Sequence, residues 1–186
     1  VVHQLERPAG ARASRVHELL QARAPRCDER VLGCDEDRVP QHVARDPHDE
    51  ELAGEAMEGG PLMLSWADVL PSEGGDAPPT AYNVVIHEFA HVLDMRDGQA
   101  DGIPLLSSSA ERRAWSEVLM AEYDRLCERV VCGYQTVLDP YAAEGPDEFF
   151  AVGSEAFFVT PQPLKEEQPA MYRLLTSYYR QNPASY

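Results

Sequence analysis

Two histidines and a glutamate form the pattern in this chain whose residue types and spacing could do chemistry. The motif is His87-Glu88-Phe89-Ala90-His91, of the form H-E-x-x-H. On a helix, residues four apart lie about 40° apart around the axis and one turn along it, so both imidazoles can reach one metal ion. Glu88, between them, would then accept a proton from a metal-activated water. The motif predicts the active-site helix of a zinc hydrolase.

The residues around the motif predict that it lies on an apolar helix over residues 81–95, with Thr80 as the N-cap. The other side chains of this helix are almost all apolar: Val84, Val85, Ile86, Phe89, Ala90, Val92 and Leu93. We therefore expect the whole helix to be buried. An unpaired polar group in a core costs roughly 2 to 7 kcal/mol, and a divalent cation removes most of that penalty. A metal site explains the buried polar groups more simply than independent burial does.

A catalytic zinc takes three protein ligands and keeps one position for water, so the two histidines need a partner. Asp97 lies where a related motif places its third ligand, but that motif needs a glycine at the position of Asp94. Asp94 itself lies two turns from His87 on the same helix and cannot easily converge on the same ion. We expect Asp94 to support a ligand or to make a buried hydrogen bond.

A second helix, predicted over residues 146–159, offers two better candidates for the third ligand. Glu148 and Glu155 lie seven residues apart, therefore on one face, in a segment rich in phenylalanine. Buried carboxylates in such surroundings favour a nearby cation. Glu148 could instead complement the helix dipole as a first-turn acid. Spacing alone does not choose between the two glutamates.

The other elements that must position this site are mostly helices. Hydrophobic periodicity predicts helices over residues 11–24, 49–57, 110–131 and 168–181, and a short strand from Leu62 to Trp66. Leu62, Leu64 and Trp66 should lie on one face of that strand and Met63 on the other. Ser108 and Glu111 form a capping box ahead of the long helix, whose inner stripe is Trp115, Val118, Leu119, Tyr123 and Leu126. The expected fold class is α+β, mainly helical, with a small β-sheet.

Composition narrows the function classes. The chain has 186 residues, enough for one domain with a sizeable core, and we expect an amino-terminal region of uncertain structure over 1–47 ahead of a domain over 48–186. With 32 acidic and 16 basic residues, its net charge of −16 argues against nucleic acid and anionic membranes as partners. It has neither a long apolar run nor the features of a signal peptide at residue 1, so a soluble cytoplasmic protein is expected.

The four cysteines are too sparse for a disulfide framework, and free thiols are the expected state. Cys27 and Cys34 could contribute to a metal site with His17 or His42, but their spacing matches no zinc-finger pattern. The H-E-x-x-H helix remains the stronger metal-binding candidate.

Four segments in the same order resemble the Mlc titration factor A family of zinc peptidases. They are Gly59–Trp66, Asn83–Met95, Asp139–Ala143 and Pro146–Val152. The likeness runs from about Asp49 to Pro183. Four ordered motifs are far more specific than H-E-x-x-H alone.

The resemblance implies a zincin-like, gluzincin-type core similar to the catalytic domain of anthrax lethal factor, with aminopeptidase activity. It implies one Zn²⁺ per chain, held by His87, His91 and the glutamate of the Pro-Asp-Glu-Phe-Phe segment, which is Glu148 here. Glu155 then becomes a partner of a ligand rather than a ligand. The resemblance also implies a link to the transcriptional repressor Mlc.

The resulting hypothesis is hydrolysis of a peptide or protein substrate by a zinc-activated water, with Glu88 as general base. Tyr141, shortly before the Glu148 helix, is the candidate donor to the tetrahedral oxyanion, or else a tyrosine packed at a turn. The alternative hypothesis is a protein-binding regulator of a transcriptional repressor, in which the zinc is structural or vestigial. Structural zinc normally has four protein ligands, and three were found, which favours catalysis.

Overall fold

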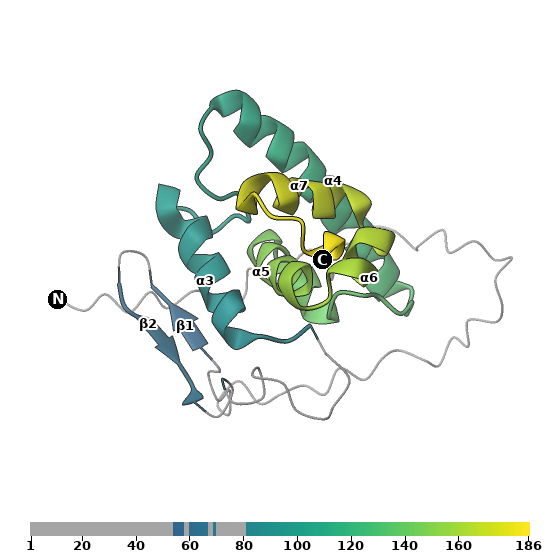
Figure 1. Ribbon diagram of the computed structural model, residues 1–186, viewed down its shortest axis with the longest axis horizontal. Coiled ribbons are helices and arrows are strands. Elements are labelled where there is room, and N and C mark those ends of the chain that lie inside the picture. Colours follow the sequence, from purple (N-terminus) through teal and green to yellow (C-terminus); the bar gives the residue numbers. More distant parts are fainter. Residues whose placement is uncertain (1–53, 58–59, 67–68, 70–80) are drawn as a thin grey trace, which may run out of the picture.

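The computed structural model describes residues 54–57, 60–66, 69 and 81–186. A helix, α5, lies at the centre, and the other helices surround it (Figure 1). The elements, labelled as in Figure 1, are β1 (Gly54–Ala56), β2 (Leu62–Leu64), α3 (Val84–Asp94), η1 (Met95–Asp97), α4 (Ser109–Val131), η2 (Pro140–Ala143), α5 (Pro146–Val159), α6 (Pro161–Glu167), α7 (Pro169–Tyr179) and η3 (Pro183–Ser185). The predicted fold class, mainly helical with a small β-sheet, is confirmed.

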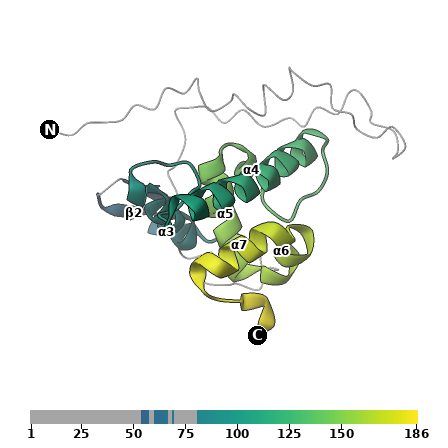
Figure 2. The same cartoon turned by 90° about the horizontal axis from the view of Figure 1, so that it is seen from above.

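The core is built around α5, which is buried on all sides. Every residue of α5 from Asp147 to Phe157 is buried. Phe149 packs edge-on against Tyr123 of α4, and Phe150 packs edge-on against Trp115 of the same helix. The long helix α4 packs against both α5 and α7, and in the view of Figure 2 α6 and α7 lie below it. Such a central helix holds any polar group it carries in a dry and rigid environment.

The amphipathic helix α4 forms largely as its sequence predicts. Its N-cap Ser108 accepts a hydrogen bond from the backbone N–H of Glu111, and Trp115, Leu119, Tyr123 and Leu126 are buried. Val118, expected in the same stripe, is only half-buried. Gly133, with φ of +71°, follows the end of the helix as expected.

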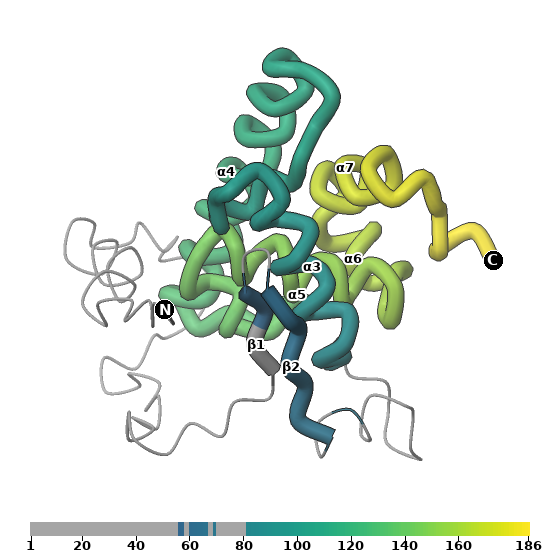
Figure 3. Tube along the Cα trace, turned by 90° about the vertical axis from the view of Figure 1, so that its left-hand side faces the viewer, coloured from purple at the N-terminus to yellow at the C-terminus, as the bar shows by residue number. Residues whose placement is uncertain are grey.

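The sheet is small and lies beside α3, on the side away from α6 (Figures 1 and 3). In it β1 pairs antiparallel with β2, with Gly54 opposite Leu64 and Ala56 opposite Leu62. The helix predicted over 49–57 is therefore wrong for 54–56, while 49–53 lie outside the described residues. Gly54 would weaken a helix interior by roughly 1 kcal/mol relative to alanine, and strand pairing gives its backbone groups partners.

The strand prediction is correct in its central part. Leu62 and Leu64 are half-buried and Met63 is exposed, which is the expected alternation. Trp66, expected on the inner face, lies beyond the end of β2 and is 69% exposed. Its placement in the strand is wrong, because pairing with β1 ends at Leu64.

Two predictions about helices need correction, and one helix was not predicted. The N-cap of α3 is Asn83, whose Oδ1 accepts from the N–H of Ile86 at 3.0 Å, and not Thr80, which lies outside the described residues. The whole helix is not buried: Phe89 is 52% exposed, because α5 covers only one face of α3. No helix was predicted for residues 161–167, where α6 forms with Pro161 in its first turn, a position at which proline is tolerated. The predicted helix 11–24 lies outside the described residues.

Candidate metal centre

The two histidines of the motif lie on the face of α3 that packs against α5. Val84, Glu88, Ala90 and Asp94 form the buried part of this helix, and His87 and His91 lie at its border. The Nε2 atoms of the two imidazoles are 3.1 Å apart. The four-residue spacing on the helix thus brings the two Nε2 atoms close enough to bind one metal ion, as predicted.

The third group comes from α5. Pro146 begins this helix, so Glu148 lies in its first turn, where it is 6% exposed. Its Oε2 atom lies 3.2 Å from Nε2 of His87 and 3.3 Å from Nε2 of His91. Among the described residues, these three side chains form a group that could hold a metal ion.

The separations between the three donor atoms fit a metal ion. Around a tetrahedral zinc with bonds of about 2.0 to 2.1 Å, ligand atoms lie roughly 3.3 to 3.4 Å apart. The separations here are 3.1, 3.2 and 3.3 Å. Glu148 Oε2 is buried and accepts no hydrogen bond from the described residues. A buried carboxylate oxygen that makes no well-formed hydrogen bond, next to two imidazole nitrogens, is what a bound divalent cation would satisfy.

Glu155 contacts His87 on the other side of the imidazole ring. Its Oε1 atom lies 2.8 Å from Nδ1 of His87, and its Oε2 accepts a hydrogen bond from the backbone N–H of Asn83. The ring of His87 therefore lies between Glu155 at Nδ1 and Glu148 at Nε2. Spacing did not distinguish the two glutamates. In the structure Glu148 lies beside Nε2 of both histidines, and Glu155 contacts only His87, at Nδ1.

The electrostatics of the site follow from these contacts. Burial opposes protonation of His87, but the carboxylates of Glu148 and Glu155 outweigh it and raise the pKa of the imidazole to about 10. Burial likewise opposes ionisation of Glu148, yet the adjacent imidazoles of His87 and His91 hold the pKa of that carboxyl well below its usual range. A positive charge is thus strongly favoured among these groups.

The two predicted catalytic residues, Glu88 and Tyr141, lie near the histidines. Glu88 is 6% exposed, between the histidines on α3. Tyr141, in η2 just before α5, is 45% exposed, and its ring centroid is 6.2 Å from that of His87. The N–H of Tyr141 donates to Asp139 Oδ1, a turn contact that fixes the start of η2.

The other described residues considered as metal ligands are not part of the group formed by His87, His91 and Glu148. Asp94 is fully buried, and its Oδ2 accepts from the N–H of Gly102 at 2.9 Å, which is the buried hydrogen bond expected of it. Asp97 pairs with Arg112 and is not in the group with the histidines. Cys27 and Cys34 lie outside the described residues.

The contact at Gly102 is a feature that sequence reasoning missed. Gly102 has φ of +77°, and its carbonyl accepts from Trp115 Nε1 at 3.0 Å. This glycine packs directly against the backbone of Pro146, the first residue of α5. The Asp101-Gly102 dipeptide was a usable turn signal.

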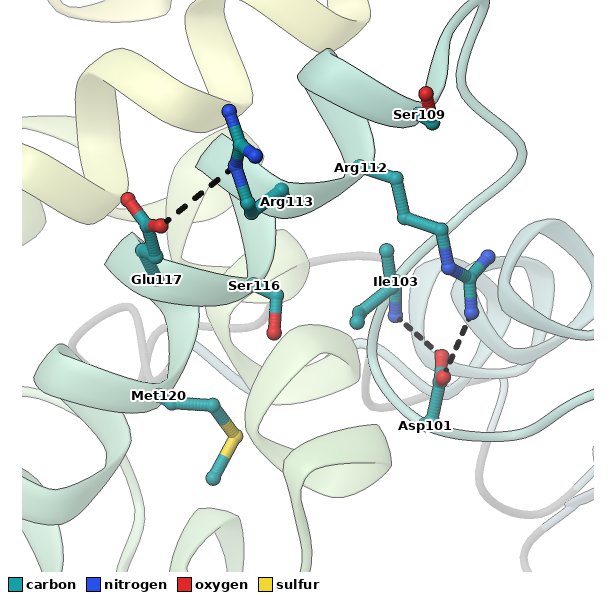
Figure 4. Close-up of a pocket in the computed structure, with 8 residues that line it drawn as sticks. All are labelled: Asp101, Ile103, Ser109, Arg112, Arg113, Ser116, Glu117 and Met120. Atoms are coloured by element: carbon teal, nitrogen blue, oxygen red, sulfur yellow. Dashed lines mark hydrogen bonds and ion pairs between the residues drawn. The ribbon is translucent and has the colours of Figure 1, made fainter.

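A separate shallow hollow of about 500 Å³ lies along the first half of α4, outside the metal centre (Figure 4). Its charged groups are already paired: Arg112 with Asp101 at 2.9 Å, and Arg113 with Glu117 at 3.9 Å. We assign no function to this hollow.

Comparison with known proteins gives the family of this chain. The family model for glucose-regulated metallo-peptidase M90 matches residues 33–180. The chain belongs to this family. The match begins before Asp49, where the resemblance was expected to start, and so includes part of the predicted amino-terminal region.

Curated relatives support the same family. Mlc titration factor A of Edwardsiella ictaluri is 41% identical over 134 residues, 70% of this chain and 49% of the relative. The protein of the same name from Pectobacterium atrosepticum is 37% identical over the same length and shares. An uncharacterized protein of Synechocystis sp. is 34% identical over 161 residues, 83% of this chain and 58% of the relative. The chain spans about half the length of the curated relatives it matches.

The family confirms the predicted resemblance to Mlc titration factor A and makes the chain a member of a metallopeptidase family. Together with the three-residue group, it indicates a divalent metal. In the described part of the chain, no helix combines the length and apolar character needed to cross a bilayer.

Proposed function

We propose that this chain is a zinc-dependent peptidase of the aminopeptidase type, in which His87, His91 and Glu148 hold one Zn²⁺. The observation that carries the proposal is the set of three donor atoms 3.1 to 3.3 Å apart, one of them a buried oxygen without a hydrogen bond from the described residues. Two imidazoles and one carboxylate are the ligand set of many catalytic zinc sites. When bound, the metal would polarise the substrate carbonyl and lower the pKa of a water toward roughly 7.

The protein residues would then move the protons. Glu88 follows His87 on α3 and is buried, so its carboxylate is shielded from bulk water. In the proposed reaction Glu88 accepts a proton from the attacking water and passes it to the leaving amine. Tyr141 lies at the exposed rim beside His87, and its phenol would donate a hydrogen bond to the tetrahedral oxyanion. The substrate is a peptide or protein, and the proposed location is the cytoplasm.

A second candidate function rests on the relatives' name. Proteins called Mlc titration factor A are 36 to 41% identical to this chain. A role as a binding partner of an Mlc-type repressor is therefore a proposal for this chain too, with the metal structural or vestigial. The net charge of −16 suits a basic protein surface. Three ligands rather than four favour the catalytic role of the metal.

The test of the metal centre is zinc content per chain after exhaustive dialysis. We expect about one zinc in the wild type and much less in Glu148→Ala, because removal of one of three ligands leaves two. Glu122→Ala is the matched control: it removes a buried carboxylate on α4 that pairs with Arg125 and should keep the metal. Absence of zinc from the wild type would sink the enzyme proposal and favour the binding role.

The test of the chemistry is peptidase activity of metal-loaded Glu88→Gln and Tyr141→Phe. Glu88→Gln should keep the metal and lose at least about 100-fold in kcat, the usual contribution of a general base. Tyr141→Phe should lower kcat with little change in metal content. Full turnover in Glu88→Gln would remove Glu88 from the mechanism, and unchanged kcat in Tyr141→Phe would leave Tyr141 as a residue packed at a turn.

A further inference from the structure

We propose that Glu155 is a positioning residue for the metal centre, which fixes the His87 ring and joins it to the first turn of α3. Glu155 is 3% exposed, on the buried face of α5. Its two oxygens contact different groups of α3: Oε1 lies 2.8 Å from His87 Nδ1, and Oε2 accepts from the N–H of Asn83. The proposal rests on the metal centre proposed above and adds a residue that is not itself a ligand.

The contact at Nδ1 determines which nitrogen of His87 is available to a metal. A neutral imidazole has one N–H and one lone pair, and the hydrogen bond at one nitrogen sets the state of the other. With the N–H at Nδ1 donating to Glu155, the proton that a metal displaces is the one at Nε2, which points to Nε2 of His91 and Oε2 of Glu148. Glu155 therefore both selects the tautomer and limits rotation of the ring.

The contact at Asn83 places the same carboxylate at the amino terminus of α3. Asn83 is the N-cap, and its side chain accepts from the N–H of Ile86. The first N–H groups of a helix lack partners within the helix, and a negative charge near them is favourable. By receiving the N–H of Asn83, Glu155 fixes the position of α3 along α5. One carboxylate thus couples helix packing to the orientation of a ligand.

The experiment compares Zn²⁺ affinity of wild type, Glu155→Ala, Glu155→Gln and Glu155→Asp, by chelator competition well below the unfolding temperature of every variant. Loss of such a supporting carboxylate typically lowers metal affinity 10- to 100-fold, and we expect that range for Glu155→Ala. In Glu155→Gln the amide oxygen can still accept from His87 Nδ1–H, but the amide nitrogen cannot accept from Asn83, so its affinity should lie between those of the wild type and Glu155→Ala. Glu155→Asp keeps the charge but is shorter and cannot span both partners, so its affinity should fall.

Glu122→Ala again serves as the matched control, since a merely structural role of Glu155 would lower stability without changing metal affinity. An affinity of Glu155→Ala within about twofold of the wild type would overturn the proposal, because supporting residues act over 10- to 100-fold. If Glu155→Ala does not fold, the other two variants decide. Wild-type affinity in Glu155→Asp then overturns the positioning role of Glu155. Lower affinity in Glu155→Asp than in Glu155→Gln supports that role.

A second readout separates this proposal from the metal proposal. In metal-free, isotope-labelled protein, hydrogen exchange of the Asn83 amide should be slow in the wild type and faster in Glu155→Ala, because that variant has no acceptor for the N–H. Glu122→Ala should leave this exchange unchanged. A wild type that binds no Zn²⁺ but shows this pattern contradicts the metal centre while Glu155 still anchors α3. A wild type that binds Zn²⁺ with no change in affinity or exchange in Glu155→Ala contradicts only the role of Glu155.

Discussion

Replacement of Gly102 by alanine should disturb the metal centre from a distance. Gly102 lies between η1 and α4 with φ of +77°. An added Cβ would lie 2.3 Å from the carbonyl oxygen of Pro146, 2.8 Å from its carbonyl carbon, and 2.9 Å from Cδ2 of Leu119. The Leu119 side chain can rotate, but the Pro146 backbone cannot move without shifting the start of α5. Glu148 lies two residues further along that helix.

The cost can be assembled from two contributions. A non-glycine residue with left-handed φ costs roughly 1 to 2 kcal/mol. Overpacking against a close-packed interior adds roughly 1 to 3 kcal/mol. The free energy of unfolding of Gly102→Ala should therefore fall by about 2 to 5 kcal/mol. For a chain of this size each kcal/mol lowers Tm by about 2 to 4 °C, so the expected fall in Tm is roughly 4 to 20 °C.

The assay is thermal unfolding, together with Zn²⁺ affinity at a temperature where the variant is folded. Gly133→Ala is the matched control: its φ is +71°, and an added Cβ would meet no atom within 4 Å. That control bears only the backbone cost of roughly 1 to 2 kcal/mol and should keep its metal affinity. Equal losses of stability in the two variants, or unchanged affinity in Gly102→Ala, would refute the idea that contact with Pro146 positions Glu148.

Three further predictions follow from charge and capping. The pKa of about 10 for His87 in the metal-free protein means that Zn²⁺ displaces a proton at neutral pH. The affinity for Zn²⁺ should therefore rise about tenfold per pH unit between roughly 7 and 9. Chelator competition across this pH range measures the slope, and an affinity that does not change with pH contradicts the prediction. Burial of Asp94 outweighs its hydrogen bond from Gly102 and raises the pKa of Asp94 to about 7. Because the folded pKa exceeds the unfolded one, ionisation of Asp94 removes stability as the pH rises from about 4 to 7. Asp94→Asn keeps an acceptor for Gly102 and should therefore gain stability relative to wild type between pH 5 and 8 in denaturant unfolding; an equal difference at both pH values argues against this. Asn83→Ala removes the acceptor for the N–H of Ile86 and should cost roughly 1 kcal/mol, with a Tm lower by about 2 to 4 °C; an unchanged Tm would show that the cap contributes no stability.

The sequence was most informative where local rules act alone. The spacing of His87 and His91 predicts that both imidazoles face one point, and their Nε2 atoms do lie 3.1 Å apart. The capping residue Ser108 and the buried stripe of α4 also follow from local patterns. These features need only the period of a helix and the chemistry of its first turn, so tertiary packing does not change them.

The sequence could not assign separate roles to Glu148 and Glu155. Both lie on one face of α5, seven residues or about 10.5 Å apart, and either could approach a histidine. The distinction depends on how α3 lies against α5, which places one glutamate at each nitrogen of His87. Long-range packing likewise explains why Phe89 is exposed.

Metal exchange at this centre should be slow, because α5 would supply both a ligand, Glu148, and the carboxylate of Glu155 that contacts Nδ1 of His87. As long as α3 and α5 stay packed, the ring cannot rotate away from the metal without losing its contact with Glu155. Release of the ion then requires partial separation of two packed helices, α3 and α5, rather than rotation of a single side chain. We expect the dissociation rate to be independent of chelator concentration and to rise in denaturant well before the protein unfolds globally.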